Sequence, residues 1–306
     1  MKILECVPNF SEGQNPRFLD ILASEVASIK DVRLLDYSQD QDHNRSVFTI
    51  IGSMEGVLEA TLCMCNKAVQ LIDMRQHNGV HPRIGAVDVV PFVPLGKATM
   101  DDAVAVAHHF GEIFGAENKI PIYYYGEASR LDGRQHLPTI RKGGYEGLAQ
   151  KLQDPEWLPD NGIIAMNAKS GATAVGARMP LVAFNINLES NDIDDAKRIA
   201  SAIREANGGL AGVRAIGLLL ASAGVAQVSI NIVDYRKTTL KQLFDRVNHE
   251  AQQAGVAIRN SELIGLVPKD AMGASAEYLR IDNFSQNRLL ESYLDRFIAD
   301  ITSRKE

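Results

Sequence analysis

Two stretches of the chain repeat the same order of periodic segments, and this order restricts the fold more than any other feature of the sequence. In the first half, the hydrophobic periodicity predicts a strand, helix, strand, strand, helix and strand, followed by one more helix and strand. The second half repeats strand, helix, strand, strand, helix and strand. This order is typical of the split βαβ motif. We therefore predict an α+β protein of two ferredoxin-like (βαββαβ) subdomains, each an antiparallel sheet with helices on one face.

The two subdomains are expected to meet at a segment that lacks clear periodicity. Between residues 126 and 178 glycine and proline accumulate, which predicts a long functional or linking loop. We place the boundary after residue 180, giving an N-terminal subdomain at 1–180 and a C-terminal subdomain at 181–306. The predicted strands are 3–9, 32–36, 45–51, 86–93, 121–125, 181–188, 213–220, 225–233 and 256–267, and the predicted helices are 15–29, 55–73, 101–117, 192–206, 239–253 and 289–301.

The composition argues against several classes of protein. The net charge is −6 and no basic block is present, which argues against binding to nucleic acid. No apolar run approaches the roughly 20 residues that a membrane span needs, and no signal peptide is visible. The three cysteines, Cys6, Cys63 and Cys65, show no spacing typical of a disulfide framework or a zinc site. We expect a cytoplasmic protein without a membrane partner.

The segment 73–94 concentrates residues that can carry chemistry. His77 and His81 have the one-turn spacing of a metal pair, but the turn signal at Asn78 and Gly79 breaks the helix between them. No third ligand is evident, so we predict no metal site. Pro82 biases His81 toward an extended backbone at the entrance to a strand that carries Asp88, and loops at strand ends often hold catalytic groups.

Strand alternation predicts which polar side chains occupy the sheet faces without helices. A ferredoxin-like sheet has helices on one face, so its other face is solvated, paired or used. Several predicted strands place an amide or a charged group on that open face, and we expect the two open faces to meet across a polar groove. The residues assigned to these positions are Glu5, Asn9, Arg45, Thr49, Asp88, Asn185, Asn187, Gln227, Ser229 and Asn231.

Motifs distributed along the chain carry a family resemblance. The segment RQHNGVHPRIGAVDVVPF at 75–92 resembles the signature of the glutamate formimidoyltransferase family, the formiminotransferase part of formiminotransferase-cyclodeaminase. Further segments agree in the same order: ECVPNFSEG at 5–13, NRSV at 44–47, YGEA at 125–128, LPTIR at 137–141, GATAVGAR at 171–178, AFNINL at 183–188 and GLVP at 265–268. The chain resembles a stand-alone form, because no cyclodeaminase part follows.

The resemblance implies two ferredoxin-like subdomains and a reaction between two small molecules. A formimidoyl group would move from N-formimidoyl-L-glutamate to N5 of tetrahydrofolate, with release of glutamate. The resemblance assigns His81 as the general acid/base, with His77 as its neighbour, and a histidine that titrates near neutrality suits this role. Tetrahydrofolate, or its polyglutamate, would be a co-substrate. The family also tends to form homodimers.

The resemblance implies contacts for both substrates. The segment that aligns with the folate-contacting part of the family is Gly162, Ile163, Ile164, Ala165, Met166, Asn167, Ala168, Lys169, Ser170 and Gly171. Arg45, Arg83 and Arg178 lie in matched motifs and are candidates for binding substrate carboxylates, or else they form structural ion pairs. Glu5, Asp88 or an aspartate of the loop 36–42 would orient the ring of His81.

The chain departs from the better-known animal members in two places. They read Ser-Trp-Gly-Ala-Thr where this chain has KSGAT at 169–173, and Asp-x-Asp where it has Asp36, Tyr37 and Ser38. An aromatic surface is therefore absent, and Asp40 or Asp42 is expected to compensate for the missing carboxylate. Two alternatives remain: a folate-dependent enzyme that moves a formyl group to or from glutamate, and a non-catalytic ferredoxin-like module that binds folate or an amino acid.

Overall fold

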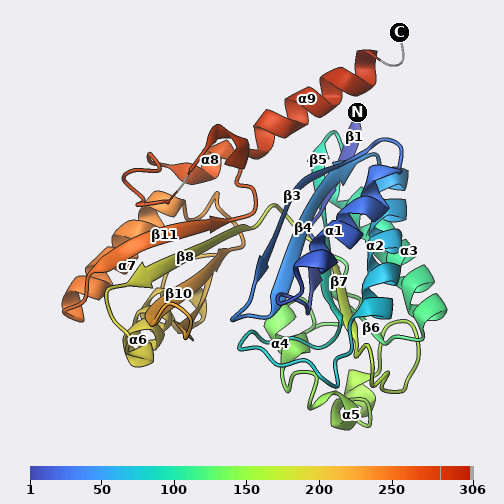
Figure 1. Cartoon of the computed structure of the whole chain (residues 1–306), viewed down its shortest axis with the longest axis horizontal. Helices are drawn as coiled ribbons and strands as arrows, with labels where there is room; N and C mark the ends of the chain where they lie inside the picture. Colours follow the sequence, from blue (N-terminus) through green and yellow to red (C-terminus); the bar gives the residue numbers. More distant parts are fainter. Residues whose placement is uncertain (283, 304–306) are drawn as a thin grey trace. The chain divides into compact units, whose positions relative to one another are not determined.

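The computed structural model describes the backbone of residues 1–282 and 284–303. The chain divides into two compact units, Met1–Arg178 and Met179–Glu306, where the sequence placed the boundary after residue 180. The first unit runs from blue to yellow-green in Figure 1 and the second from yellow to red. In the described part of the chain, no helix is long and apolar enough to cross a bilayer.

The first unit is a sheet covered on one face by three helices (Figure 1). Across the sheet the order is β3, β4, then β1 and β2 end to end, then β5, β7 and β6. The elements are β1 (Lys2–Cys6), β2 (Asn9–Phe10), α1 (Pro16–Ala27), β3 (Val32–Asp40), β4 (Arg45–Gly52), α2 (Met54–Leu71), β5 (Val87–Gly96), α3 (Met100–Asn118), β6 (Ile122–Gly126) and β7 (Thr173–Ala177). The antiparallel strands β3, β4, β1 and β5 have the ferredoxin-like order, as predicted.

Strand β7 corrects the expectation for this unit. The segment 126–178 was expected to be a loop and the sheet to be antiparallel, but β7 lies between β5 and β6 and runs parallel to both. A strand that is buried on both faces lacks the alternation of polar and apolar residues, so its pattern was not visible in the sequence. Gly176 has no room for a side chain, since a Cβ there would lie 2.5 Å from the ring of Tyr125.

A second apolar cluster covers the other face of the sheet beside β5, β7 and β6. It is formed with three short helices from the expected loop segment, α4 (Leu137–Arg141), α5 (Leu148–Lys151) and η1 (Pro155–Trp157). Its buried members are Ile84, Val89, Tyr123, Tyr125, Ile140, Leu148, Leu152, Ala172 and Ala174. Because α4 packs here, it brings its last residue, Arg141, to the polar part of this face.

The second unit has the predicted ferredoxin-like fold. Its strands lie in the order β11, β8, β10, β9, and each neighbouring pair is antiparallel. Helices α6 and α7 contribute to the core on one face of this sheet. The elements are β8 (Val182–Leu188), α6 (Ile193–Ile203), η2 (Glu205–Asn207), β9 (Val213–Leu220), β10 (Val225–Ile232), α7 (Leu240–Gln253), β11 (Ile258–Ile264), α8 (Lys269–Met272), η3 (Gln286–Arg288) and α9 (Leu290–Ser303).

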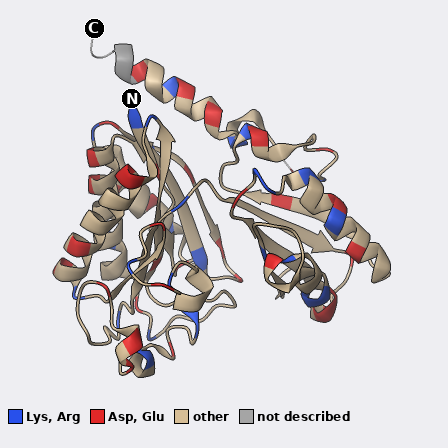
Figure 2. Ribbon diagram, turned by 180° about the vertical axis from the view of Figure 1, so that it is seen from behind, with Lys and Arg blue, Asp and Glu red and all other residues tan. Residues whose placement is uncertain are grey.

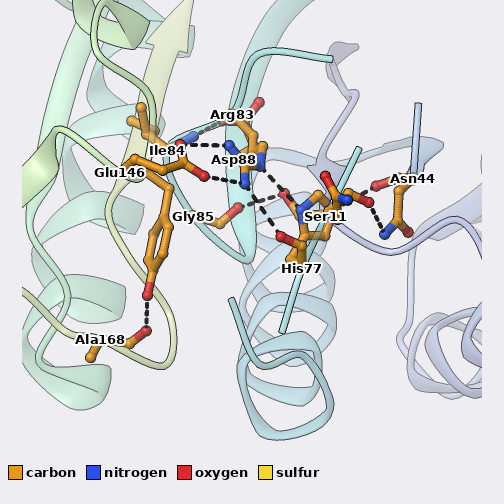
Figure 3. A network of polar contacts seen from close by, with 11 residues as sticks. Ser11, Asn44, His77, Arg83, Ile84, Gly85, Asp88, Glu146 and Ala168 are labelled. Atoms are coloured by element: carbon orange, nitrogen blue, oxygen red, sulfur yellow. Dashed lines mark hydrogen bonds and ion pairs between the residues drawn. The ribbon is translucent and has the colours of Figure 1, made fainter. Parts of the chain in front are cut away.

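The turn between β3 and β4 holds the loop that carries the two histidines. Asn44 adopts a left-handed backbone with φ of 46°. Its side-chain Oδ1 accepts a hydrogen bond from the Gly13 amide, and its Nδ2 donates to the Asn78 carbonyl, both at 2.8 Å. The Asn44 carbonyl also lies 3.0 Å from His77 Nε2. One residue therefore fixes the turn and positions the loop 72–86 (Figure 3).

We expect substitutions of Asn44 to separate the contribution of its side-chain hydrogen bonds from that of its left-handed backbone. Asn44→Gly keeps the left-handed backbone but removes both side-chain hydrogen bonds, so the free energy of unfolding should fall by roughly 1–3 kcal/mol. Asn44→Ala also places a Cβ in the left-handed region and should cost about 1 kcal/mol more. Urea denaturation of the three proteins measures both differences. An alanine variant as stable as the glycine variant would contradict the backbone contribution.

Candidate active site

The imidazole of His81 makes two hydrogen bonds that define its tautomer. Nε2 lies 2.7 Å from Nη1 of Arg45, and Nδ1 lies 2.8 Å from the Pro82 carbonyl oxygen. A guanidinium can only donate and a carbonyl can only accept. Nε2 is therefore the unprotonated acceptor, and Nδ1 carries the proton and donates to Pro82. The ring of His81 is thus held as a neutral imidazole whose lone pair faces Arg45.

The surroundings of His81 keep its ring neutral. Burial lowers the pKa of His81 well below its ordinary value, and the positive charges of Arg45, Arg141 and, in its protonated form, His43 lower it further. The hydrogen bond to the Pro82 carbonyl opposes this shift. The expectation of a histidine that titrates near neutrality is therefore corrected. His81 is available as a base at pH 7, whereas its protonated form is disfavoured until another group supports it.

A buried carboxylate near His81 pairs with Arg141 and lies within electrostatic reach of Arg45. Asp88 is 1% exposed; its Oδ1 accepts a 2.8 Å hydrogen bond from the Ile84 amide, and its Oδ2 pairs with Nη2 of Arg141. Burial lowers the pKa of Arg45 to about 10, and the charge of Arg141 adds to this effect, while Asp88 and Asp40 oppose it. The Nε of Arg141 is buried without a hydrogen-bond partner among the described residues. Arg45, Arg141 and Asp88 carry two positive charges and one negative charge, with Asp40 as a further carboxylate within electrostatic reach of Arg45, and the two guanidiniums suit an anion.

The hydrogen bonds of this cluster show which groups orient the ring of His81. The sequence left Glu5, Asp88 and the aspartates of the loop 36–42 as candidates. Asp88 instead binds the Ile84 amide and Arg141, and the recorded hydrogen bonds of the His81 ring go to Pro82 and Arg45. Arg141 was not among the predicted site residues. Arg141 belongs to a motif of the family, but the helix that brings it to Asp88 is too short to show hydrophobic periodicity in the sequence.

His77 and Arg83 are engaged with other protein groups (Figure 3). His77 Nδ1 accepts a hydrogen bond from Arg83 Nε at 3.1 Å, so Nε2 donates to the Asn44 carbonyl. The guanidinium of Arg83 pairs with both carboxylate oxygens of Glu146, at 2.9 and 2.6 Å. Hydrogen bonding by Arg83 lowers the pKa of Glu146. Arg83 thus already binds a protein carboxylate, and both ring nitrogens of His77 are occupied.

Glu5 and Arg178 form a second polar cluster on the same face of the sheet. Burial raises the pKa of Glu5 to about 7, and the charge of Arg178 partly opposes the shift. Burial also raises the pKa of Tyr125, which both Arg178 and Arg141 oppose. The Tyr125 ring therefore lies within electrostatic reach of both guanidiniums. In the pairing of β1 with β5, Glu5 lies opposite Val93, five residues beyond Asp88. Val93 and Asp88 are thus separated by roughly 16 Å at the usual rise of a strand.

The remaining predicted side chains belong to local networks. Asn9 donates to the Val7 carbonyl at 2.8 Å, between β1 and β2. In the second unit, Gln227 Nε2 donates to Asn187 Oδ1 at 2.9 Å, and Asn185 pairs across the strands with Ser229. Both asparagines alternate with the core residues of β8 and so lie on the face opposite the helices. The groove expected between the open faces of the two units stays a prediction.

The predicted folate segment, 162–171, lies in the first unit immediately before β7, rather than between the two units. Gly162 and Gly171 have φ of 80° and 70°, and a Cβ at either position would lie within about 2 Å of a backbone oxygen. The end of the segment is tightly held: Met74 and Ala86 donate their amides to the carbonyls at 169 and 170, both at 2.8 Å. Its middle is open, with Ile164 64% exposed.

The described residues contain no group of three histidine, cysteine or carboxylate side chains placed to hold a metal ion. The site is instead a buried cationic cluster around a neutral imidazole, with a glycine-bounded loop in the same unit. Such an arrangement can accept a proton, bind carboxylates and contact a ligand through its backbone. It can therefore support group transfer between anionic small molecules.

Comparison with known proteins identifies the family of the chain. Residues 3–178 match the family model of the formiminotransferase domain, N-terminal subdomain, and residues 183–292 match that of the formiminotransferase domain. The chain is 44% identical to a glutamate formimidoyltransferase of Streptococcus pyogenes over 295 residues, covering 96% of this chain and 99% of the relative. It is 38% identical to a glutamate formimidoyltransferase of Thermoplasma acidophilum, covering 97% and 98% of the two chains.

Larger relatives match over part of their length. The chain is 44% identical to the formimidoyltransferase-cyclodeaminase of Sus scrofa over 289 residues, which cover 92% of this chain and 53% of the relative. The chain thus spans about half the length of that protein. Together with the two family models, which cover both units, these matches confirm the resemblance seen in the sequence. The chain belongs to the formiminotransferase family.

Proposed function

We propose that the protein is a glutamate formimidoyltransferase, which moves the formimidoyl group of N-formimidoyl-L-glutamate to N5 of tetrahydrofolate and releases glutamate. Relatives with this name align with the chain over nearly its full length. The observation that carries the proposal within the structure is the neutral His81 imidazole held against Arg45 and next to Arg141. The site thus combines a base with surplus positive charge, which a reaction between anionic substrates requires.

His81 is the proposed general acid/base. N5 of tetrahydrofolate attacks the formimidoyl carbon, and the new C–N5 bond forms as N5 loses its proton. The C–N bond to glutamate then breaks, and the glutamate nitrogen gains a proton. A neutral imidazole can take the first proton at Nε2, once Arg45 releases that atom, and return it to the leaving nitrogen. No proton is gained or lost overall, so the enzyme is restored after each turnover.

Arg45 and Arg141 are the proposed contacts for a substrate carboxylate. N-formimidoyl-L-glutamate carries two carboxylates, and charge-assisted hydrogen bonds from arginine are strong and directional. The buried Nε of Arg141 without a partner supports this assignment, because buried polar groups are normally paired. Arg178 lies beside Glu5 at the second cluster and is a candidate for a further carboxylate. Arg83 is less suited, since Glu146 already occupies its guanidinium.

The segment 162–171 is the proposed contact for folate. Its two glycines hold the ends of the segment tightly against the protein's own backbone, and the exposed Ile164 between them offers an apolar surface to a flat ring system. We also keep the homodimer, the cytoplasmic location and a reaction that needs no metal as parts of this proposal. Tetrahydrofolate would act as a co-substrate that is consumed.

Removal of the proposed base tests the function directly. With N-formimidoyl-L-glutamate and tetrahydrofolate, we expect the parent to release glutamate and His81→Ala to be slower by about 10²–10⁴-fold, the usual contribution of an acid/base group. The acid limb of kcat/KM should lie below pH 6.5, because the pKa of His81 is lowered and activity is lost only when the ring becomes protonated. Arg45→Gln removes a neighbouring positive charge, so it should move this limb to higher pH.

Two controls make this test specific. His77→Ala should lose much less activity, since its ring binds Asn44 and Arg83. N-formyl-L-glutamate replaces the donor in a parallel assay, and its preferred use would favour the formyltransferase alternative. Turnover of His81→Ala within a few-fold of the parent would refute the assignment of His81. Folate binding without turnover of either donor would point to the non-catalytic module.

Substitution of Arg141 should weaken substrate binding. Arg141→Gln removes a charge-assisted contact worth roughly 1.5–3 kcal/mol, so the KM for N-formimidoyl-L-glutamate should rise by about 10–150-fold. Because Asp88 would lose its partner, Arg141→Lys serves as a second variant that keeps the charge but not the two-pronged geometry. Arg83→Gln is the matched control and should change KM less. Equal KM values for Arg141→Gln and the parent would assign Arg141 a purely structural role.

Folate should protect the exposed middle of the proposed folate segment. Amide hydrogen exchange at 163–166 should slow on addition of tetrahydrofolate, because these residues are the open part of the loop. The amides of Ser170 and Gly171 already donate hydrogen bonds to Asn167 and should change little. Glutamate alone serves as the control ligand. Identical exchange at 163–166 with and without tetrahydrofolate would remove the segment from the binding site.

A further inference from the structure

A second histidine lies beside His81 and has no role in the mechanism above. His43 follows β3 in the turn to β4 and is 6% exposed. Its ring centroid is 5.8 Å from that of His81, and the two rings meet edge to face at 71°. The ionisable groups around this pair of rings are Asp40 on β3, which contacts His43, and Arg45 and Arg141, which act on His81.

Asp40 holds His43 through both of its carboxylate oxygens, one on the backbone amide and one on the ring. Oδ1 accepts a 2.8 Å hydrogen bond from the His43 amide, and Oδ2 lies 3.3 Å from Nδ1 of the same residue. A carboxylate beside Nδ1 favours the tautomer with its proton there, which leaves the lone pair on Nε2. Asp40 itself is partly open to solvent, with 46% of its side chain exposed.

The second ring nitrogen of His43 is a buried hydrogen-bond acceptor that has no donor in the part of the chain that the structure describes. Nε2 is shielded from solvent and has no hydrogen-bond partner among the described residues. Leaving a buried polar atom unpaired is costly, and such atoms are rare in folded proteins. A leucine would fill this position without burying an unpaired polar atom. The arrangement is explained if a partner appears for Nε2 during the reaction.

We propose that His43, held by Asp40, accepts a hydrogen bond from the protonated ring of His81 during formimidoyl transfer. This inference rests on the function proposed above. When His81 takes the N5 proton at Nε2, it loses its hydrogen bond with Arg45, because both groups are then donors. The imidazolium of His81 turns one N–H toward His43 Nε2. The negative charge of Asp40 then stabilises the positive charge on the two hydrogen-bonded rings. Return of the proton to the glutamate nitrogen restores the neutral His81 and its bond with Arg45.

His43 is thus a positioning residue that acts through His81, and matched substitutions isolate its Nε2. The amide nitrogen of asparagine takes the place of Nδ1, so His43→Asn keeps the bond to Asp40 and deletes Nε2. The amide of glutamine reaches the place of Nε2, so His43→Gln can still offer an acceptor oxygen to His81. In Asp40→Asn, the new amide donates toward Nδ1, which forces the His43 proton onto Nε2 and destroys the acceptor.

Steady-state turnover with N-formimidoyl-L-glutamate and tetrahydrofolate tests the inference. We expect kcat to fall about 10–100-fold in His43→Asn and in Asp40→Asn, part of the total acid/base contribution, while both KM values stay within threefold of the parent. His43→Gln should recover most of the lost rate. Nitrogen NMR of the histidine rings should show Nε2 of His43 unprotonated in the parent at pH 7 and protonated in Asp40→Asn.

The outcomes that would overturn the inference are distinct from those that would overturn the function. A parent that turns over normally alongside an equally active His43→Asn rejects the role of His43 alone. The same holds if His43→Gln is as slow as His43→Asn, or if only KM changes. If NMR shows Nε2 of His43 protonated in the parent, His43 is not an acceptor, whatever the activity of the variants. This NMR measurement decides the question even if His43→Asn fails to fold. A parent that releases no glutamate rejects the proposed function and the inference together.

Discussion

The buried carboxylate of Asp88 connects the parts from which the site is built. It lies on β5, binds the amide of Ile84 at the end of the histidine loop, and pairs with Arg141 on the helix that covers this face of the sheet. Loss of one partner from a buried ion pair costs about 3–5 kcal/mol, because the remaining charge has no compensation. Asp88 therefore joins the loop, the strand and the covering helix, and together with the hydrogen bonds of Asn44 it holds the loop that carries His81.

The same carboxylate sets the electrostatics of the site, because it neutralises only one of two neighbouring guanidiniums. Burial lowers the pKa values of both His81 and Arg45, and the neighbouring guanidinium charges lower them further. This local field contrasts with the net charge of −6 and with the mixture of acidic and basic residues along the helices (Figure 2). A bound anion would offset the surplus charge and raise the pKa of His81 again. The proposed base would therefore gain proton affinity when an anionic substrate is present, which couples binding to chemistry.

The sequence predicted the parts of the structure that rest on local periodicity. Alternation placed Glu5 and Arg45 on the sheet face without helices, and the order of segments predicted both ferredoxin-like units. Asp88 was also assigned to that face, and it reaches it at an irregularity of β5, where Val87 packs with the helices and Val89 with the opposite cluster. The features it missed depend on contacts between distant residues. Strand β7 is buried on both faces and has no alternation, and α4 is a single short turn whose value comes from bringing Arg141 to Asp88. The pairing of Arg83 with Glu146 likewise joins residues 63 positions apart.

The hairpin of β3 and β4 shows how an edge strand can contribute to the site. Strand β3 was predicted to end at residue 36, but it continues to Asp40, since polar residues are tolerated where a strand has a neighbour on one side only. The extension carries Asp40 to the start of the turn, where it holds His43. The resemblance led us to expect Asp40 or Asp42 to replace a carboxylate absent at Ser38. The ring of His43 lies against that of His81, so a carboxylate on this strand can influence His81 through a second imidazole without touching it.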